Sequence, residues 1–374
     1  MRQRAPSLWL ARALVPATLS LSFGAPLSAQ LRRDVPSTPS CLTCSVTLSK
    51  VVTLGAADGP GAFSTRPYFI GQDSRGRFYA VTPDSPDELP YVFDAQGRYL
   101  QRLGRVGDGP GEFRSPTVLR VRQDTLYVLD TSGRITILSP SYAIVTTFTG
   151  PRGAMDALPL SNGTIVVNAL VRDRDRFGFM QHLLDRRGNY LGSFDPDTLA
   201  FNPRNITARK RVMADGGTGR MWTAPLAHHY VVSAWSLTGQ LEKQLTRTPT
   251  WFPSYDRAWL VSPTVAPMPY VLGLWEAPDG YLWVVARVAD PNWKQGLGKA
   301  VEVEGRTIYP VDDAQEVYDS VIEVIDPLTA RLVASTRLPG TIDVVIRPGL
   351  VAGVRETEKG ALVAEVFRVQ WTSP

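Results

Sequence analysis

LGAADGPGAF at residues 54–63 returns as LGRVGDGPGEF at residues 103–113, and this repeated glycine-proline turn decides the fold. Asp58 and Asp108 stand 50 positions apart in the two copies. Each copy runs from the end of one apolar stretch, through Gly and Pro, to the start of the next. A fixed period of this length is typical of proteins built from repeated units that bury their apolar faces against their neighbours.

Four short strands are expected directly after the second copy, at 117–121, 125–130, 134–138 and 143–148. Each either alternates apolar with polar residues or is wholly apolar and β-branched, and turn residues fill the gaps. Similar quartets are expected at 68–73, 77–82, 91–95 and 99–103; at 156–160, 164–169, 179–185 and 190–194; at 211–215, 220–223, 230–236 and 240–245; and at 271–277, 281–286, 320–325 and 331–337. The sequence therefore predicts an all-β protein of radially repeated sheets.

The last blade is short by one strand, because only three strands are expected after the fifth quartet, at 342–346, 350–354 and 361–370. Residues 46–54 stand before the first glycine-proline turn as residues 99–103 stand before the second. We therefore expect the N-terminal strand to complete the sixth blade, which removes an exposed sheet edge. The prediction is a six-bladed β-propeller with four-stranded antiparallel blades, closed by its N-terminal strand.

The second blade carries a resemblance to a known family. GDGPGEF at 107–113, Pro116, LYVLD at 126–130 and the pair Arg134-Ile135 resemble the NHL repeat of six-bladed propellers. The match is partial in blades 1, 3 and 5 and faint in blades 4 and 6. The resemblance implies structural roles for Asp130 and Arg134. It also implies a fold shared by binding modules and by enzymes such as lactonases and amidating lyases, so the fold alone does not choose a function.

The N-terminus predicts export. Arg2, Arg4 and Arg12 precede an apolar run at 13–25. The run is followed by small residues of the kind found before a signal-peptide cleavage site, so residues 1–29 are typical of a signal peptide. The apolar run is shorter than the roughly 20 residues that span a bilayer, and no later stretch approaches that length. We expect a secreted or periplasmic protein of an exported bacterial type, without a membrane span.

The mature chain is expected to contain a Pro-, Ser- and Thr-rich extension at 30–45 and the propeller at 46–374. The extension holds Cys41 and Cys44, the only two cysteines, which predict a local disulfide in an oxidising compartment. A redox motif would need a helix N-terminus there, and covalent haem attachment would need His where Ser45 stands.

The net charge gives no sign of nucleic-acid binding. The formal charge of +5 becomes +2 once the three arginines of the signal peptide are removed, and the other basic residues are scattered. The local cluster at 172–176 alternates Arg with Asp, as solvated loops do. We expect a monomer that binds no nucleic acid.

The long connections are expected on one face of the ring. In a four-stranded antiparallel blade, the loops between strands 2 and 3 share a face with the loops between blades, and every long loop belongs to this set. These loops are expected at 83–90, 171–178, 194–210, 246–270 and 287–319. Long loops in compact domains usually carry function, so we expect ligand binding on this face.

Candidate ligand-binding residues follow from this orientation, as charged residues at the channel mouth and as His or Trp in the loops. They are Arg66, Asp156, Lys210, His228, His229, Trp251, Trp259 and Asp343. Aromatic residues on a rim suit recognition of sugars, peptides or proteins. The alternative is that they pack as lids over the outer strands.

No catalytic residue or metal site is predicted. Adjacent residues such as His228 and His229 point to opposite sides of a strand and are poorly placed to share a zinc ion, a departure from the amidating lyases. Asp156 and Asp343 supply few oxygen ligands for calcium. The sequence contains neither a Gly-x-Ser-x-Gly elbow nor a phosphate-binding loop.

Two functions therefore remain open. The first is an exported, non-catalytic binding or scaffold module, without a cofactor, that holds a peptide, glycan or partner protein through the long-loop face. The alternative is a hydrolase or lyase of the lactonase type, with calcium at the channel mouth near Asp156 and Asp343. Stoichiometric calcium in the purified protein would favour the enzyme.

Overall fold

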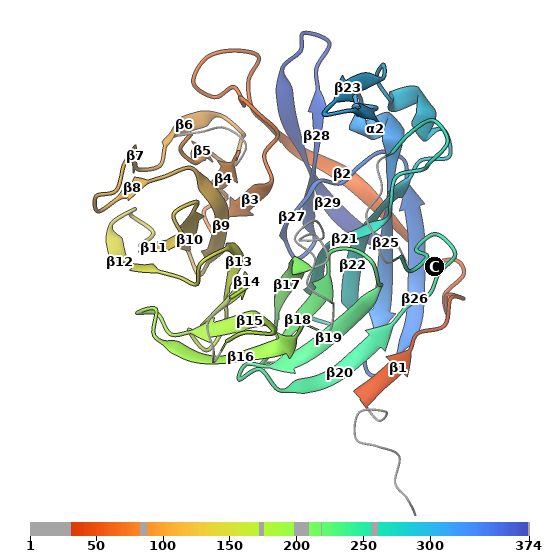
Figure 1. The fold of residues 1–374 in the computed structure, drawn as a ribbon, viewed down its shortest axis with the longest axis horizontal. Helices are drawn as coiled ribbons and strands as arrows, with labels where there is room; N and C mark the ends of the chain where they lie inside the picture. The colour runs from red at the N-terminus through yellow and green to blue at the C-terminus, as the bar shows by residue number, and fades with distance from the viewer. Residues whose placement is uncertain are drawn as a thin grey trace, which may run out of the picture.

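The computed structural model describes residues 31–82, 88–171, 176–197, 209–217, 219–255 and 261–372. These residues form two small two-stranded sheets and six sheets of four or five strands, and the six are arranged as a ring that Figure 1 shows radiating from a common axis. The predicted fold class, a six-bladed β-propeller, is confirmed. The predicted signal peptide lies outside the described residues, and the described part includes no helix long and apolar enough to cross a membrane.

The first three blades are consecutive antiparallel quartets, in which the strands run in order from the innermost to the outermost. Blade 1 contains β3 (Phe69–Gln72), β4 (Phe78–Val81), β5 (Tyr91–Phe93) and β6 (Tyr99–Arg102). Blade 2 contains β9 (Pro116–Arg122), β10 (Thr125–Asp130), β11 (Arg134–Leu138) and β12 (Ile144–Thr149). Blade 3 contains β13 (Ala154–Pro159), β14 (Ile165–Ala169), β15 (Phe179–Leu184) and β16 (Tyr190–Pro196).

The other three blades follow the same order. Blade 4 contains β17 (Arg211–Gly216), β18 (Arg220–Pro225), β19 (Val231–Ser236) and β20 (Leu241–Thr246). Blade 5 contains β21 (Tyr270–Glu276), β22 (Leu282–Ala289), β25 (Tyr318–Asp326) and β26 (Arg331–Leu338). Blade 6 contains β27 (Val344–Arg347), β28 (Leu350–Glu356), β29 (Leu362–Thr372) and β2 (Ser45–Leu54). A small parallel sheet of β7 (Arg105–Val106) and β8 (Glu112–Phe113) lies between blades 1 and 2.

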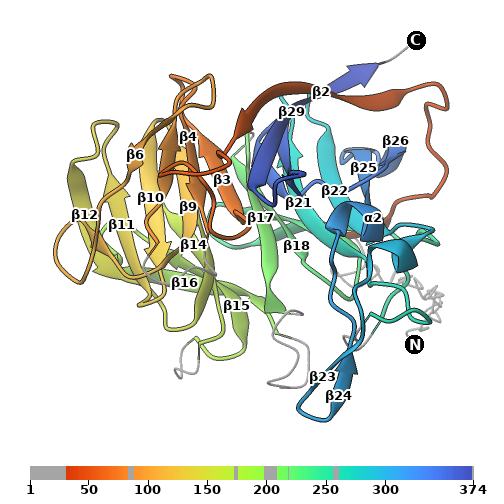
Figure 2. The same ribbon diagram turned by 90° about the horizontal axis from the view of Figure 1, so that it is seen from above.

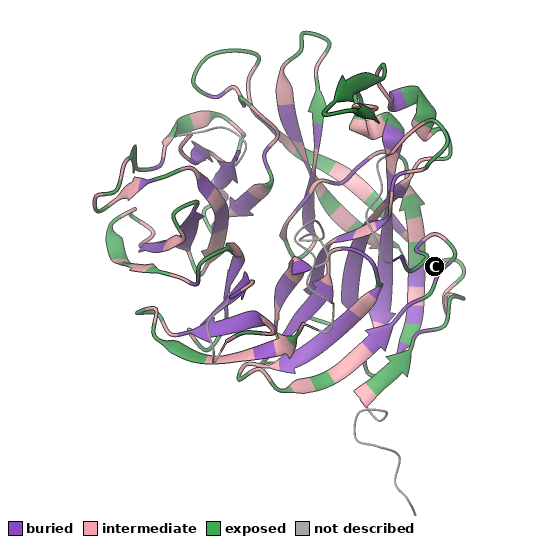
Figure 3. Cartoon of the chain, in the orientation of Figure 1, coloured by how far each residue is buried: buried purple, intermediate pink, exposed green. Residues whose placement is uncertain are grey.

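The apolar cores lie between neighbouring blades. Tyr127 and Ile135 of blade 2, for example, belong to the same cluster as Ala157 and Val167 of blade 3. Because both faces of an inner strand contact a neighbouring blade, such strands are apolar along most of their length. Figure 3 shows burial concentrated in the inner strands and exposure in the outer ones.

β2 closes the ring. It pairs antiparallel with β29, from Ser45 opposite Thr372 to Leu54 opposite Ala364, so both ends of the chain complete one blade. Val46 is buried in the cluster that joins blades 5 and 6, and Leu54 in the cluster that joins blades 6 and 1. The predicted closure by the N-terminal strand is confirmed.

The extension before β2 also joins the sheets, which the sequence did not predict. β1 (Arg32–Asp34) adds to blade 4 as a fifth strand, parallel to β20. Val35 is buried in the core of that blade, and the N–H groups of Ser40 and Cys41 donate to carbonyls of β26. Residues 31–44, which we call the strap, therefore follow the outer edges of blades 4 and 5.

The long connections share one face, as predicted. The strand order places the β4–β5, β14–β15, β16–β17, β20–β21 and β22–β25 connections at the same end of the blades. The last of these contains η2 (Trp293–Gly296), the hairpin β23 (Val301–Val303) and β24 (Arg306–Ile308), and α2 (Ala314–Val317). Figure 2 shows this hairpin projecting from the ring. We call this side of the ring the long-loop face.

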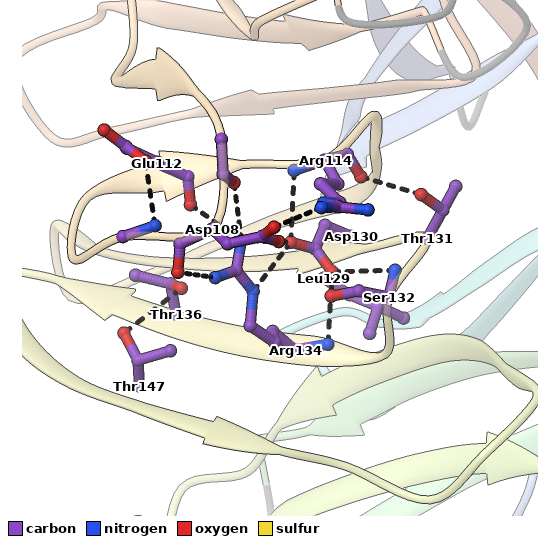
Figure 4. Close-up of polar contacts among 12 residues, drawn as sticks. Asp108, Glu112, Arg114, Leu129, Asp130, Thr131, Ser132, Arg134, Thr136 and Thr147 are labelled. Atoms are coloured by element: carbon purple, nitrogen blue, oxygen red, sulfur yellow. Dashed lines mark hydrogen bonds and ion pairs between the residues drawn. The ribbon is translucent and has the colours of Figure 1, made fainter.

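A polar network holds the second glycine-proline turn, which connects blade 1 to blade 2 in the sequence, against blade 2 (Figure 4). Asp130, at the end of β10, pairs with the guanidinium of Arg134 at 3.0 Å. The same guanidinium donates to the carbonyl oxygens of Gly107, Asp108 and Glu112. Both side chains therefore hold the turn against the blade, which is the structural role that the family resemblance implied.

Candidate functional site

Two predicted residues, Arg66 and Asp343, meet on the long-loop face where the innermost strands of blades 1 and 6 begin. Arg66 Nη2 lies 3.7 Å from Asp343 Oδ1, and Arg287 Nη2, from the end of β22, lies 2.6 Å from the same oxygen. The other carboxylate oxygen accepts the N–H of Val354 at 2.6 Å. Two cations from different blades therefore share one carboxylate, which leaves an excess of positive charge.

Tyr270 and Tyr318 enclose the guanidinium of Arg287. Its Cζ lies 5.1 and 5.2 Å from the two ring centroids, within the range of cation–π attraction. Burial raises the pKa of Tyr270, although Arg287 opposes the shift, so the phenol is neutral at physiological pH. The Nε of Arg287 is buried and has no hydrogen-bond partner among the described residues. Arg66, Arg287, Asp343, Tyr270 and Tyr318 form what we call the Asp343 cluster.

Asp156 has a different partner. Its Oδ2 lies 2.6 Å from Arg120 Nη2, which joins the innermost strands of blades 3 and 2. Arg120 also lies over the ring of Phe69, at 4.9 Å from the centroid. Its Nε is likewise buried without a hydrogen-bond partner in the described part of the chain. Asp156 and Asp343 are therefore each neutralised by at least one arginine.

The two adjacent histidines lie in different environments. His228 is buried, and its Nδ1 lies 2.7 Å from the carbonyl oxygen of Tyr255. The two rings also pack at 4.7 Å between centroids, so His228 anchors the β20–β21 connection. His229 is exposed. Lys210 stands just before β17, and its backbone carbonyl accepts the N–H of Leu226.

Aromatic residues of the β20–β21 connection pack as a lid over blade 4. Phe252 and Tyr255 are buried, and Trp251 is half-buried with its ring 5.8 Å from that of Tyr230. All three contact the core shared by blades 4 and 5. These three side chains therefore pack as a lid, which was the alternative to ligand binding. Trp259 lies outside the described residues.

Cys41 and Cys44 are joined by a disulfide. It closes a small loop between the strap's hydrogen bonds to blade 5 and the start of β2. Metal ligands are not clustered in the part of the chain that the structure describes, where no three His, Cys, Asp or Glu side chains come close enough to hold an ion.

Sequence reasoning missed four residues, which are Arg120, Arg287, Tyr270 and Tyr318. Arg120 alternates with apolar residues inside an innermost strand, and a charge at such a position is a signal that could have found it. Arg287 and Tyr318 stand at the two ends of the longest connection. The contact of Arg287 with Asp343 depends on how blades 5 and 6 pack, and its contact with Tyr318 depends on the pairing of β22 with β25. The sequence carries no local signal for either.

Comparisons with known proteins agree with this architecture. A family model described as a 6-bladed beta-propeller matches residues 77–148. A candidate exported protein from Bacteroides fragilis is similar in structure, with a TM-score of 0.55 and 10% sequence identity over 91% of this chain and 99% of its own. The likeness is one of fold. No curated protein sequence matches the chain.

Two further solved structures are similar at lower scores. A protein of unknown function from Bacteroides caccae has a TM-score of 0.44 and 10% identity over 75% of this chain and 84% of its own. The WD40 domain of Pan2 from Neurospora crassa has a TM-score of 0.45 and 10% identity over 86% of this chain and 95% of its own. At these scores neither protein contributes to the functional argument.

Proposed function

We propose that this protein is an exported, non-catalytic binding module that holds a peptide, glycan or partner protein on its long-loop face. The observation that carries the proposal is the Asp343 cluster, where two arginines share one carboxylate beside two tyrosines. Its excess positive charge favours a ligand that presents a carboxylate, since charge-assisted bonds to arginine are among the strongest hydrogen bonds in proteins. Arg66 is accessible to such a ligand, with 34% of its side chain exposed.

Export is part of the proposal. It is supported by the signal-like sequence at 1–29 and by the structural similarity to the candidate exported protein from Bacteroides fragilis. The Asp130–Arg134 network supports an NHL-type repeat in blade 2.

The lactonase-type alternative has less support. Asp156 and Asp343 are the carboxylates that it would need, and each already holds an arginine at 2.6 Å. A calcium ion bound by either carboxylate would lie beside the positively charged guanidinium group that already pairs with it. Two positive charges so close together repel strongly in a partly buried site.

The experiment is a comparison of Arg66→Gln with wild-type mature protein. The probes are an oligogalacturonate and a glutamate-rich peptide, and calorimetric titration measures their affinity. We expect Arg66→Gln to weaken binding about tenfold, the effect of losing one charge-assisted bond. We also expect added salt to weaken binding of the wild type.

Arg98→Gln is the matched control, because Arg98 lies in the turn between β5 and β6 on the opposite face and 77% of its side chain is exposed. Its affinity for both probes should equal that of the wild type. The proposal is wrong if neither probe binds, or if Arg66→Gln and Arg98→Gln bind equally well. Stoichiometric calcium in the purified protein, with lost stability on chelation, would favour the enzyme instead.

A further inference from the structure

A cleft lies between blades 5 and 6, apart from the Asp343 cluster. It has a volume of about 110 Å³ and is lined by residues of these two blades and of α2. Its apolar walls are Leu48, Leu338, Ile342 and Phe367, which also belong to the core between the blades. None of the residues that form the Asp343 cluster lines the cleft, so the two are separate sites.

Two glycines keep this space open. Gly353 of β28 lies two residues after Val351, whose side chain is buried between the blades, so a side chain at 353 would point into the cleft. A β-carbon there would lie 2.8 Å from the carbonyl oxygen of Thr341, which leaves room only for glycine. Gly340 has a φ of +75°, a conformation that favours glycine. The close approach of the backbone therefore leaves the cleft without a side chain to fill it.

The polar groups inside the cleft already satisfy one another. The side-chain amide of Gln315 bonds to the N–H and to the carbonyl of Thr341, at 3.0 and 3.4 Å. The hydroxyl of Ser320 donates to the carbonyl of Gly340 at 3.1 Å and accepts the N–H of Ile342 at 2.7 Å. A ligand need not supply partners for these groups, so an apolar group can enter the cleft without leaving them unpaired.

The rim of the cleft carries an excess of positive charge. Glu365 Oε1 lies 2.8 Å from Arg355 Nη2 and 2.6 Å from Lys50 Nζ, and the two cationic side chains are 44% and 49% exposed. Hydrogen bonds from Arg355 and then from Lys50 lower the pKa of Glu365, so its carboxylate is ionised at neutral pH. It cancels one of the two positive charges. Lys50 stands opposite Phe367, one residue before a β-bulge at Val51, so its side chain lies on the cleft side of β2.

Arg355 is the charged residue of the rim that can contact a ligand in the cleft. It lines the cleft, and its Nη2 donates to Glu365. Its Nε and Nη1 make no hydrogen bond in the part of the chain that the structure describes. Because a guanidinium forms strong charge-assisted hydrogen bonds with carboxylates, these donors favour a ligand that carries one.

We propose that the cleft binds a free short-chain carboxylic acid as its anion. The aliphatic body of the acid lies between Leu48, Leu338 and Phe367, and its carboxylate pairs with Arg355 at the rim. The volume limits this body to about four or five carbon atoms, because an apolar cavity of roughly 150 Å³ holds benzene. The site is separate from the Asp343 cluster, so the inference does not depend on the proposed function.

The test is an NMR titration of isotopically labelled mature protein with isovalerate, isovaleramide and acetate. Isovalerate has both the branched body and the carboxylate, isovaleramide lacks the charge, and acetate lacks the body. We expect isovalerate to shift the methyl signals of Leu48, Leu338 and Ile342 at millimolar concentration. The other two compounds should bind about tenfold more weakly, since each loses one of the two interactions.

Arg355→Gln should weaken the binding of isovalerate about tenfold and leave that of isovaleramide unchanged, because only the charge-assisted bond is lost. Arg368→Gln is the matched control. Arg368 is exposed and follows Phe367 in β29, so its side chain points to the opposite side of the strand. This variant loses the same charge and should bind isovalerate like the wild type.

Arg66→Gln separates the cleft from the Asp343 cluster. It should bind isovalerate like the wild type, and a loss of affinity would place the acid in that cluster and overturn the proposal. The proposal is also wrong if isovalerate does not bind, or if isovaleramide or acetate binds as tightly. Equal affinities of Arg355→Gln and Arg368→Gln for isovalerate would contradict the role of Arg355 and overturn it as well.

Discussion

Two Asp–Arg pairs with the same spacing differ in how far they are buried. In the Asp130–Arg134 pair the side chains are 1% and 16% exposed, and in the Asp94–Arg98 pair they are 17% and 77% exposed. Only the guanidinium of Arg134 also donates hydrogen bonds to three backbone carbonyls of the glycine-proline turn. Breaking a buried pair leaves an uncompensated charge, whereas exposed pairs contribute little.

Arg134→Ala should therefore lower the free energy of unfolding by about 3 kcal/mol, because the Asp130 carboxylate and three carbonyl groups lose the guanidinium that pairs with them. Arg98→Ala should lower it by less than about 1 kcal/mol. Urea denaturation followed by circular dichroism measures both values. Equal losses in the two variants would show that the network around the turn does not stabilise the fold.

Glu88 is a half-buried carboxylate with many partners. Burial alone would raise its pKa, but hydrogen bonds from Ser64, Thr82, Tyr91 and Arg102 outweigh this effect and lower the pKa to about 2. The unfolded chain has the ordinary value of 4.5. A carboxylate with a lower pKa in the folded state stabilises the fold above the unfolded value and loses that contribution as the pH falls.

Glu88→Gln should accordingly destabilise the protein at neutral pH and flatten the fall in stability between pH 4.5 and about 2. The check is a set of urea titrations at several pH values for the variant and the wild type. The same slope in both proteins over that range would mean that Glu88 does not contribute to acid sensitivity.

At the residue scale, the sequence predicted the roles of those residues whose positions follow from the family pattern or from the expected strand starts. Asp130 and Arg134 follow from the family pattern, and Arg66 and Asp343 follow from the expected strand starts. The repeat alone did not locate Arg120, whose partner Asp156 comes from another blade, or Tyr318, which meets Arg287 across two strands of blade 5 that a long connection separates in the sequence.

Among the elements, β2 both closes the ring and supplies side chains to the cores on both sides of blade 6. Leu54→Ala should lower the free energy of unfolding by about 2–5 kcal/mol, as expected for a buried leucine. Val51→Ala, at the exposed bulge of the same strand, should change it by less than about 0.5 kcal/mol. Thermal and urea unfolding test the difference, and similar values for the two variants would contradict the difference in burial between these side chains.

Removing residues up to 54 should destabilise the whole ring, since β29 would lose its outer partner and both adjacent cores would open. Removing residues up to 44 leaves β2 in place and should have a smaller effect, because only the strap is lost. The measurement is the melting temperature of each truncation by calorimetry. An unchanged melting temperature without β2 would refute closure by this strand.

Most elements were predictable because their turns and apolar patterns repeat. The strap was not, because β1 has only three residues, all exposed, and its neighbours are Pro, Ser and Thr. Such a segment has no alternation of its own, and its pairing is set by the open edges of blades 4 and 5.

Across the whole molecule, tryptophan is distributed unevenly, which allows the two halves of the ring to be followed separately. Blades 1–3 contain none, and the described tryptophans are Trp222, Trp235, Trp251, Trp275, Trp283, Trp293 and Trp371. If the closed ring unfolds as one unit, tryptophan fluorescence from blades 4–6 and circular dichroism from all blades should give the same urea midpoint. Two separate midpoints would show that the halves unfold independently.

The pairing of β2 with β29 also sets the order in which the molecule can fold. Ser45 is among the first residues of the propeller to be synthesised, and its partner Thr372 is among the last. Contacts between such distant parts of a chain form slowly, because the entropy cost of loop closure arises before packing contacts form to offset it. The blades between them can form earlier, but the ring cannot close until β29 has left the ribosome, so synthesis of this strand sets the earliest time of ring closure.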